Sequence, residues 1–140
     1  MEKVLIIHTD GGSRGNPGPS SCAFVAEIGD KEVYKESKFL GVQTNNFAEY
    51  SGILLGLNWI VSSPPIANYQ LINFCSDSEL IVKQLNGIYK IKNQNLIKLN
   101  QEIKNIILKN DLKVVFKNIP RVRNEVADAL VNEELDKQIR

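Results

Sequence analysis

The hydrophobic period of this chain changes at Asn46, and that change limits the folds open to it. Before Asn46, short runs rich in β-branched and aromatic residues are separated by turn formers, as expected of strands. After it, apolar residues recur at helical spacing until Ser62-Ser63-Pro64-Pro65 ends the pattern. The apolar positions of this helix are Tyr50, Ile53, Leu54, Leu57, Ile60 and Val61. A chain that combines both periods in this way is expected to form an α/β fold.

Three antiparallel strands are expected in the N-terminal part. The first begins with Val4-Leu5-Ile6-Ile7 and is expected to end at Asp10, because Gly11-Gly12 and a loop full of turn formers follow. Residues 21–28 and 32–40 are the next two strand candidates, and Gly29-Asp30 between them is typical of a tight hairpin turn.

The remaining elements alternate between strand and helix. We expect a strand at 71–75, a helix opened by Ser76-Asp77-Ser78-Glu79 and ended by Gly87, a helix at 95–108, a strand at 112–116 and a helix at 124–139. The order β-β-β-α-β-α-α-β-α contains no linker or repeat, so we expect one domain over residues 1–140. Asp10 and Asp77 stand at the carboxyl ends of predicted strands, where open α/β sheets usually place their sites.

Composition excludes some classes of protein. No apolar run approaches the roughly 20 residues that a membrane span needs. No basic segment with a long apolar stretch precedes the first strand, so a cytoplasmic protein without a membrane partner is expected. Cys22 and Cys75 lie in strand-like runs without CxxC spacing, and we expect buried free thiols in a reducing compartment.

The positive charge of the chain is unevenly distributed. The formal net charge is +1, but residues 83–117 contain eight lysines and two acids, a local net charge of +6. A basic segment of this kind is typical of a surface that contacts a phosphate backbone. A solvated helix face is the competing explanation, and the charge pattern alone favours it.

Four acids are candidates for metal ligands: Asp10, Glu49, Asp77 and Asp128. Hydrolysis of a phosphodiester requires an activated water and neutralisation of charge on the phosphate, which two divalent ions about 4 Å apart can supply. Mg²⁺ prefers hard oxygen ligands, so such a site needs clustered carboxylates rather than histidines or thiolates. The chain, with one histidine and two cysteines, is suited to that chemistry.

Each of these acids also has a local explanation. Asp10 before two glycines is a typical turn residue. Glu49 lies three positions after Asn46, which is the spacing of the two residues that pair in a capping box at a helix start. Asp77 stands at the start of a predicted helix, where a negative charge interacts favourably with the helix dipole. Asp128 stands on a predicted helix, where an exposed acid is the usual case. Taken singly, none of the four decides the function.

Four motifs together resemble a known family. HTDGGSRGNPGPSSCAF, TNNFAEYSGILLGL, CSDSELIVKQLNG and PRVRNEVADALVNEEL are similar, in this order, to the sequence blocks of type 1 ribonuclease H. The resemblance runs from about residue 4 to residue 136. It implies an RNase H-like fold, with a five-stranded mixed sheet of three antiparallel N-terminal strands plus two parallel ones, flanked by helices.

The resemblance also implies an activity. The chain is expected to be an endonuclease that hydrolyses the RNA strand of RNA–DNA hybrids with two Mg²⁺ ions, or Mn²⁺ in their place, and leaves 5′-phosphate and 3′-hydroxyl ends. Asp10 would bridge the ions, Asp77 would share the ion that activates water, and Asp128 would help hold the other. Glu49 would hold metal and face a ribose 2′-hydroxyl.

Substrate-binding residues are implied in the same way. Asn16, Asn45 and Asn46 match asparagines that face the minor groove of the hybrid, where 2′-hydroxyls are displayed. Thr44 matches a hydroxyl that binds a phosphate of the DNA strand, and Asn124 matches a further asparagine of the site. Helix capping is an alternative role for Asn45 or Asn46.

The chain departs from the family pattern in several places. Asn118 stands where a loop histidine is common, Glu79 where a glutamine is common, and Val42 where an arginine is common. The only histidine of the chain, His8, is expected to be structural and to share the sheet face of Asp10. The segment after Gly87 is too short for the basic protrusion of some relatives. These differences predict lower activity and put hybrid affinity in question.

Two rival functions are also compatible with the sequence. One keeps the fold but adds cleavage of double-stranded RNA as a side activity. The other is a catalytically silent module that binds hybrid without cutting it, and the presence of all four carboxylates argues against it. No obligate protein partner is implied, and a monomer is expected.

Overall fold

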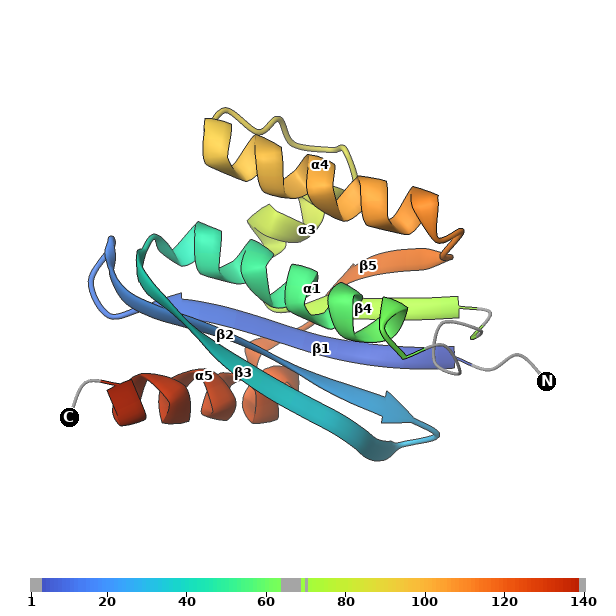
Figure 1. Ribbon diagram of the computed structural model, residues 1–140, viewed down its shortest axis with the longest axis horizontal. Helices are drawn as coiled ribbons and strands as arrows, with labels where there is room; N and C mark the ends of the chain where they lie inside the picture. The colour runs from blue at the N-terminus through green and yellow to red at the C-terminus, as the bar shows by residue number, and fades with distance from the viewer. Residues whose placement is uncertain (1–3, 64–68, 70, 139–140) are drawn as a thin grey trace.

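The centre of the structure is a five-stranded mixed sheet with the strand order β3-β2-β1-β4-β5 (Figure 1). The computed structural model describes residues 4–63, 69 and 71–138. Its strands are β1 (Val4–Ser13), β2 (Gly18–Ile28), β3 (Lys31–Gln43), β4 (Leu71–Ser76) and β5 (Val114–Asn118). The first three strands are antiparallel neighbours, whereas β4 runs parallel to β1 and to β5. The mixed sheet predicted from the sequence is therefore confirmed.

Helices cover both faces of this sheet. They are α1 (Asn45–Val61), α3 (Glu79–Leu85), α4 (Gln94–Lys109) and α5 (Glu125–Gln138), the last preceded by the 3-10 turn η1 (Arg121–Asn124). Figure 1 shows α1, α3 and α4 on one face and α5 on the other. The predicted ends at Ile139 and at Pro64-Pro65 lie outside the described residues. Within the described ranges, none of the helices has the length and hydrophobicity of a membrane span.

The hydrophobic core is divided by the sheet. The larger part fills the space between the sheet and helices α1, α3 and α4. A smaller cluster of Ala23, Val131 and Leu135 packs between β2 and α5. Cys22 and Cys75 are buried free thiols, as predicted. Burial of apolar area on both faces stabilises the sheet as the rigid layer on which the site is built.

Gly29 and Asp30 connect β2 and β3, as predicted. Both residues have positive φ angles, 57° for Gly29 and 63° for Asp30. Positive φ at both central residues is typical of a type I′ turn, whose twist matches that of the flanking strands. The prediction of a tight hairpin is confirmed.

β1 does not end at Asp10, and the prediction that it does was wrong. The strand continues through Gly11 and Gly12 to Ser13 and stays paired with β2 over this stretch. A Cβ on Gly11 would lie 2.2 Å from the carbonyl carbon of Ala48 in α1. Glycine inside a strand marks a close approach of another backbone, and here that backbone is α1.

The contact between β1 and α1 involves a glycine from each element. A Cβ on Gly52 of α1 would lie 2.7 Å from the carbonyl oxygen of Asp10, which is too close for any other residue without movement of a backbone. The absence of two side chains lets α1 lie directly on β1. This close approach brings the first turns of α1, and with them Glu49, to the level of Asp10.

We predict that Gly11→Ala destabilises the fold. The new methyl group must push α1 away from β1, and overpacking of this kind costs about 2 kcal/mol or more. Gly12→Ala is the matched control, because its Cβ would meet only a side-chain methyl of Val131, at 3.5 Å. Thermal and urea unfolding of both variants measure the difference. Equal stability of the two variants would contradict the assigned contact.

Candidate active site

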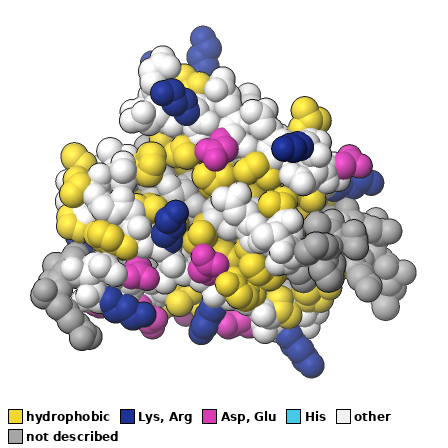
Figure 2. All heavy atoms as spheres, viewed as in Figure 1, with side chains coloured by type: hydrophobic (Ala, Val, Ile, Leu, Met, Phe, Trp, Pro, Cys, Tyr) yellow, Lys and Arg dark blue, Asp and Glu magenta, His cyan; other side chains and the backbone are white. Residues whose placement is uncertain are grey.

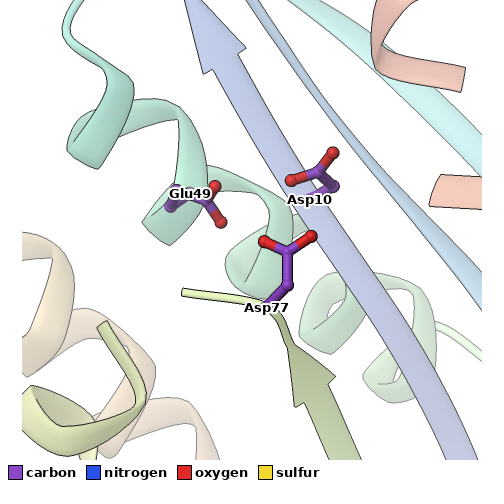
Figure 3. Close-up of side chains that lie close together, drawn as sticks. All are labelled: Asp10, Glu49 and Asp77. Carbon is purple, nitrogen blue, oxygen red and sulfur yellow. The ribbon is translucent and has the colours of Figure 1, made fainter. Parts of the chain in front are cut away.

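Three carboxylates from different elements meet at one edge of the sheet (Figure 3). Asp10 lies on β1, Glu49 lies in α1, and Asp77 directly follows β4. One carboxylate oxygen of each residue lies within 4.8 Å of the other two. Figure 3 shows the three side chains pointing toward one another. Because β1 and β4 run parallel, Asp77 reaches the level of Asp10, and the packing of α1 on β1 adds Glu49.

The structure assigns other residues to the local roles considered for these acids. The N-cap of α1 is Thr44, whose Oγ1 accepts a 3.2 Å hydrogen bond from the N–H of Phe47. Glu49 therefore lies beyond the capping positions. The N-cap of α3 is Ser78, so Asp77 precedes that helix. Asp10 lies within a strand and not in a turn.

Burial and like charge make Asp10 and Glu49 hard to ionise. Burial, followed by the charge of Asp77, raises the pKa of Asp10 to about 7, against the opposing effect of a hydrogen bond from the Gly11 N–H. The pKa of Glu49 lies well above its ordinary value because of burial and then the charges of Asp10 and Asp77. Arg121 lowers the pKa of Glu49 in part. The protein thus holds together groups that repel one another when ionised.

Asp128 lines the same cleft but is not one of the three clustered residues. The cleft has a volume of about 460 Å³ and is lined by residues of β1, α1, the β4–α3 connection, η1 and α5. Asp128 is half-buried in the first turn of α5, and its charge contributes to the raised pKa of Asp10. All four predicted carboxylates therefore face one cleft, and three of them lie at a spacing suited to a shared ligand.

The donor set fits a hard divalent cation. Glu49 Oε2 is buried and has no hydrogen-bond partner among the described residues. An unpartnered buried oxygen beside Asp10 and Asp77 is a position that a cation satisfies, and carboxylate oxygens are the ligands that Mg²⁺ prefers. His8 lies on the sheet face of Asp10 as predicted, but its Nε2 lies 3.8 Å from a carboxylate oxygen of Glu27. These three carboxylates are the residues that would hold a metal ion here.

Two of the predicted substrate asparagines, Asn16 and Asn45, are linked to each other at the rim of this cleft. Asn45 Oδ1 accepts a 2.8 Å hydrogen bond from the N–H of Ser13. The N–H of Asn45 donates in turn to Asn16 Oδ1 at 3.0 Å. Asn46 follows Asn45 in the first turn of α1, and Thr44 is the N-cap of that helix. The loop after β1 and the start of α1 thus place the predicted substrate residues of this region together.

Asn124 is placed differently from the other predicted substrate residues. It is only 1% exposed, and its Nδ2 donates to the carbonyl of Thr9 at 2.8 Å and to Asp77 Oδ2 at 3.4 Å. Contact of Asn124 with substrate stays a prediction. Its hydrogen bond to a clustered carboxylate is a role that the sequence analysis did not include.

Two arginines of the cleft were not selected as site residues from the sequence. Arg121 of η1 lines the cleft close enough to affect the pKa of Glu49. Arg14 also lines it, and its guanidinium is held 2.7 Å from Asp136 of α5. The signal available for Arg121 was its position seven residues before Asp128, but the 3-10 turn that contains Arg121 could not be predicted from periodicity.

The structure gives contacts for two of the departures from the family pattern. Asn118 Nδ2 donates to the carbonyl of Ser76 at 3.1 Å. Glu79 forms an ion pair with Lys83, with 2.7 Å between the charged atoms. Val42 is 68% exposed. Asn118 is therefore bound to the strand that precedes Asp77, and the charge of Glu79 is partly neutralised.

The basic segment is only partly free to contact phosphate. Lys83 is paired with Glu79, and Lys104 donates to the carbonyl of Leu85 and lies over the ring of Phe116. Figure 2 shows Lys and Arg side chains scattered over the face it presents, among hydrophobic and uncharged groups. A contact between this segment and a phosphate backbone stays a prediction.

Comparisons with known proteins agree with this fold. A family described as reverse transcriptase-like matches residues 8–134. LC11-RNase H1, isolated from compost and solved in complex with RNA/DNA hybrid, has a TM-score of 0.91 at 36% identity, over 97% of this chain and 99% of that one. Ribonuclease HI of Halobacterium salinarum is 34% identical over 128 residues, which are 91% of this chain and 62% of that protein.

Other relatives are much longer than this chain. A bifunctional protein of Mycobacterium tuberculosis is 37% identical over 134 residues, which are 94% of this chain but 35% of that protein. The chain therefore spans about a third of the length of these mycobacterial relatives.

We predict that Asp10→Asn stabilises the protein in a chelator at pH 8. In the folded state the pKa of Asp10 is about 7 instead of its ordinary 3.8, so the folded protein keeps a proton that the unfolded chain has released. Stability is therefore lost as pH rises from about 4 to about 7, by roughly 4 kcal/mol, and the substitution recovers part of that loss above this range.

Thermal unfolding with EDTA at pH 5 and pH 8 measures this effect. Glu133→Gln, which removes an exposed acid of α5, is the matched control and should leave the melting temperature nearly unchanged. A lower melting temperature for Asp10→Asn than for the native chain at pH 8 would show that the carboxylates do not repel one another.

Proposed function

The chain belongs to the type 1 ribonuclease H family, and from this premise we propose that it is an endoribonuclease that hydrolyses the RNA strand of RNA–DNA hybrids. The observation that carries the proposal is the cluster of Asp10, Glu49 and Asp77, whose carboxylate oxygens lie within 4.8 Å of one another in an open cleft. Hybrid is the proposed partner, double-stranded RNA a weaker substrate, and the chain acts as a single catalytic domain and a monomer.

The carboxylates would hold two Mg²⁺ ions, with Mn²⁺ as a substitute. When bound, such ions activate water and neutralise charge on the scissile phosphate. The hydrolysis is proposed to leave 5′-phosphate and 3′-hydroxyl ends. Asp10 is central to the set, since its pKa responds to both Asp77 and Asp128. Glu49 brings an unpartnered buried oxygen, and Asp128 completes the acidic wall of the cleft.

The asparagines at the rim are proposed to donate hydrogen bonds to the substrate. The side-chain oxygens of Asn16 and Asn45 already accept hydrogen bonds from backbone N–H groups. Their amide NH₂ groups are left as donors, which suits the 2′-hydroxyls and base acceptors of a minor groove. Asn46, in the same turn, is proposed to extend this row. Recognition of this kind depends on shape and sugar and not on base sequence.

Thr44 is proposed to bind a phosphate of the DNA strand. Its Oγ1 accepts the capping hydrogen bond from the Phe47 N–H, so the hydroxyl proton is still available to a phosphate oxygen. The position at the start of a 17-residue helix adds the favourable end of the helix dipole. Val42 supplies no charge to this contact, so the affinity for hybrid depends more heavily on Thr44.

Arg121 places a permanent positive charge in the cleft beside Glu49. Asn118, in the place where many family members carry a histidine, has no group that exchanges protons near neutral pH. We therefore expect slower turnover than in members with that histidine. Asn124 is retained as a substrate-binding candidate, although its amide is already engaged with Asp77.

The proposal predicts strand-selective cleavage. A hybrid with separately labelled strands should lose its RNA strand in Mg²⁺, while double-stranded DNA stays intact and double-stranded RNA is cut more slowly. Asp10→Asn and Asp77→Asn should each reduce cleavage by at least about 100-fold, because each removes a carboxylate on which the charge compensation of the transition state depends. Glu133→Gln is the control. Hybrid binding without cleavage in either Mg²⁺ or Mn²⁺ would favour the silent binding module.

A second prediction separates substrate binding from chemistry. Asn45→Asp keeps the oxygen that accepts from the Ser13 N–H but replaces the donor group with a negative charge. We expect KM for hybrid to rise about 10-fold with little change in kcat, because one donated hydrogen bond is lost. Asn58→Asp adds the same charge to an exposed position of the same helix and controls for charge alone. An unchanged KM for Asn45→Asp would remove Asn45 from the substrate contacts.

A further inference from the structure

Asp77 occupies a part of the chain that no regular element fixes. It follows Ser76, the last residue of β4, and precedes Ser78, the N-cap of α3. Its neighbours in the cleft, Asp10 and Glu49, are like charges that push its carboxylate outward once it is ionised. The position of Asp77 must therefore be held by contacts from elsewhere in the chain.

The first of these contacts acts on the backbone immediately before Asp77. The carbonyl oxygen of Ser76 accepts a 2.9 Å hydrogen bond from the N–H of Ile119, as part of the parallel pairing with β5. It accepts a second from the side chain of Asn118, at 3.1 Å. A carbonyl oxygen has two lone pairs, so both acceptor sites of Ser76 are used. Ser76 Oγ also accepts from the N–H of Ser78 at 3.1 Å, which tightens the turn that contains Asp77.

The second contact acts on the carboxylate itself. The buried amide of Asn124 donates a 2.8 Å hydrogen bond to the carbonyl of Thr9 and a 3.4 Å hydrogen bond to Asp77 Oδ2. Thr9 is the residue before Asp10. One planar NH₂ group with two fixed N–H directions therefore connects the β1 backbone beside Asp10 to the side chain of Asp77. It sets the separation of these two carboxylates, and its N–H offsets part of their repulsion.

We propose that Asn118 and Asn124 are positioning residues that hold Asp77 at ligand distance from Asp10, from the two ends of the connection between β5 and α5. This inference rests on the proposed function, because it assigns a purpose to the same carboxylate cluster. Asn118 acts on the backbone of Asp77 and Asn124 on its carboxylate. An amide engaged with the Ser76 carbonyl is a fixed support, not a mobile group that follows the substrate.

Cation affinity tests the proposal without use of the cleavage reaction. Isothermal titration of the chelator-treated protein with Mn²⁺ should give about 10-fold weaker binding for Asn124→Leu, since partners of ligand side chains typically contribute 10- to 100-fold to metal affinity. Asn118→Ala should weaken binding about 3-fold, because it removes one of several supports of the backbone. Asn105→Ala, at an exposed position of α4, should bind like the native chain.

Cleavage assays then provide a second readout. For both variants, raising the Mg²⁺ concentration should restore the rate, because the weakened step is metal binding, and KM for hybrid should change little for Asn118→Ala. If Asn124→Leu fails to fold, Asn118→Ala still tests the proposal, because Asn118 is exposed. A native-like melting curve of Asn118→Ala in EDTA establishes that its fold is intact.

Native cation affinity in a folded Asn118→Ala, or in a folded Asn124→Leu, would overturn the proposal even if the native chain cleaves hybrid. Failure of the proposed function has a different signature: the native chain binds Mn²⁺, both variants bind it more weakly, and none of them cuts RNA. Absence of Mn²⁺ binding by the native chain would overturn both proposals.

Discussion

Like-charge repulsion among Asp10, Glu49 and Asp77 is the interaction that the surrounding structure must overcome. Burial raises the pKa of Asp10 and Glu49 because water no longer solvates their charges, and the neighbouring carboxylates raise it further. The sheet, with an apolar cluster packed against each face, supplies the stability that keeps these groups together. A divalent cation bound there would turn the same arrangement from a destabilising one into a favourable one.

The close approach of α1 to β1 is the packing feature that makes the cluster possible. Gly11 and Gly52 remove the side chains that would separate the two elements, so Glu49 reaches Asp10. Asp10 and Asp77 lie at one sheet edge as predicted, because the carboxyl ends of parallel strands meet there. Gly11 resembles a turn former in the sequence, and β1 was therefore predicted to end too early. The use of this glycine for packing depends on a helix that lies far away in sequence.

The candidate site was predictable to a different degree in each of its parts. The four carboxylates follow from the motifs, and the structure brings all four to one cleft. The contacts that hold them do not follow from the motifs. Asn124 reaches Asp77 only because η1 turns the chain before α5, and Arg121 enters the cleft by the same turn. Periodicity predicted a helix from Asn124 onward and gave no sign of that preceding turn.

Anomalous diffraction from crystals soaked in Mn²⁺ tests most directly whether the carboxylate cluster is a divalent-cation site. The account predicts manganese peaks in the cleft, within bonding distance of carboxylate oxygens of Asp10, Glu49 and Asp77, with Asp128 directed at the same ions. A well-ordered cleft without a manganese peak at saturating Mn²⁺ would contradict it, as would a peak bound only by residues outside this cluster.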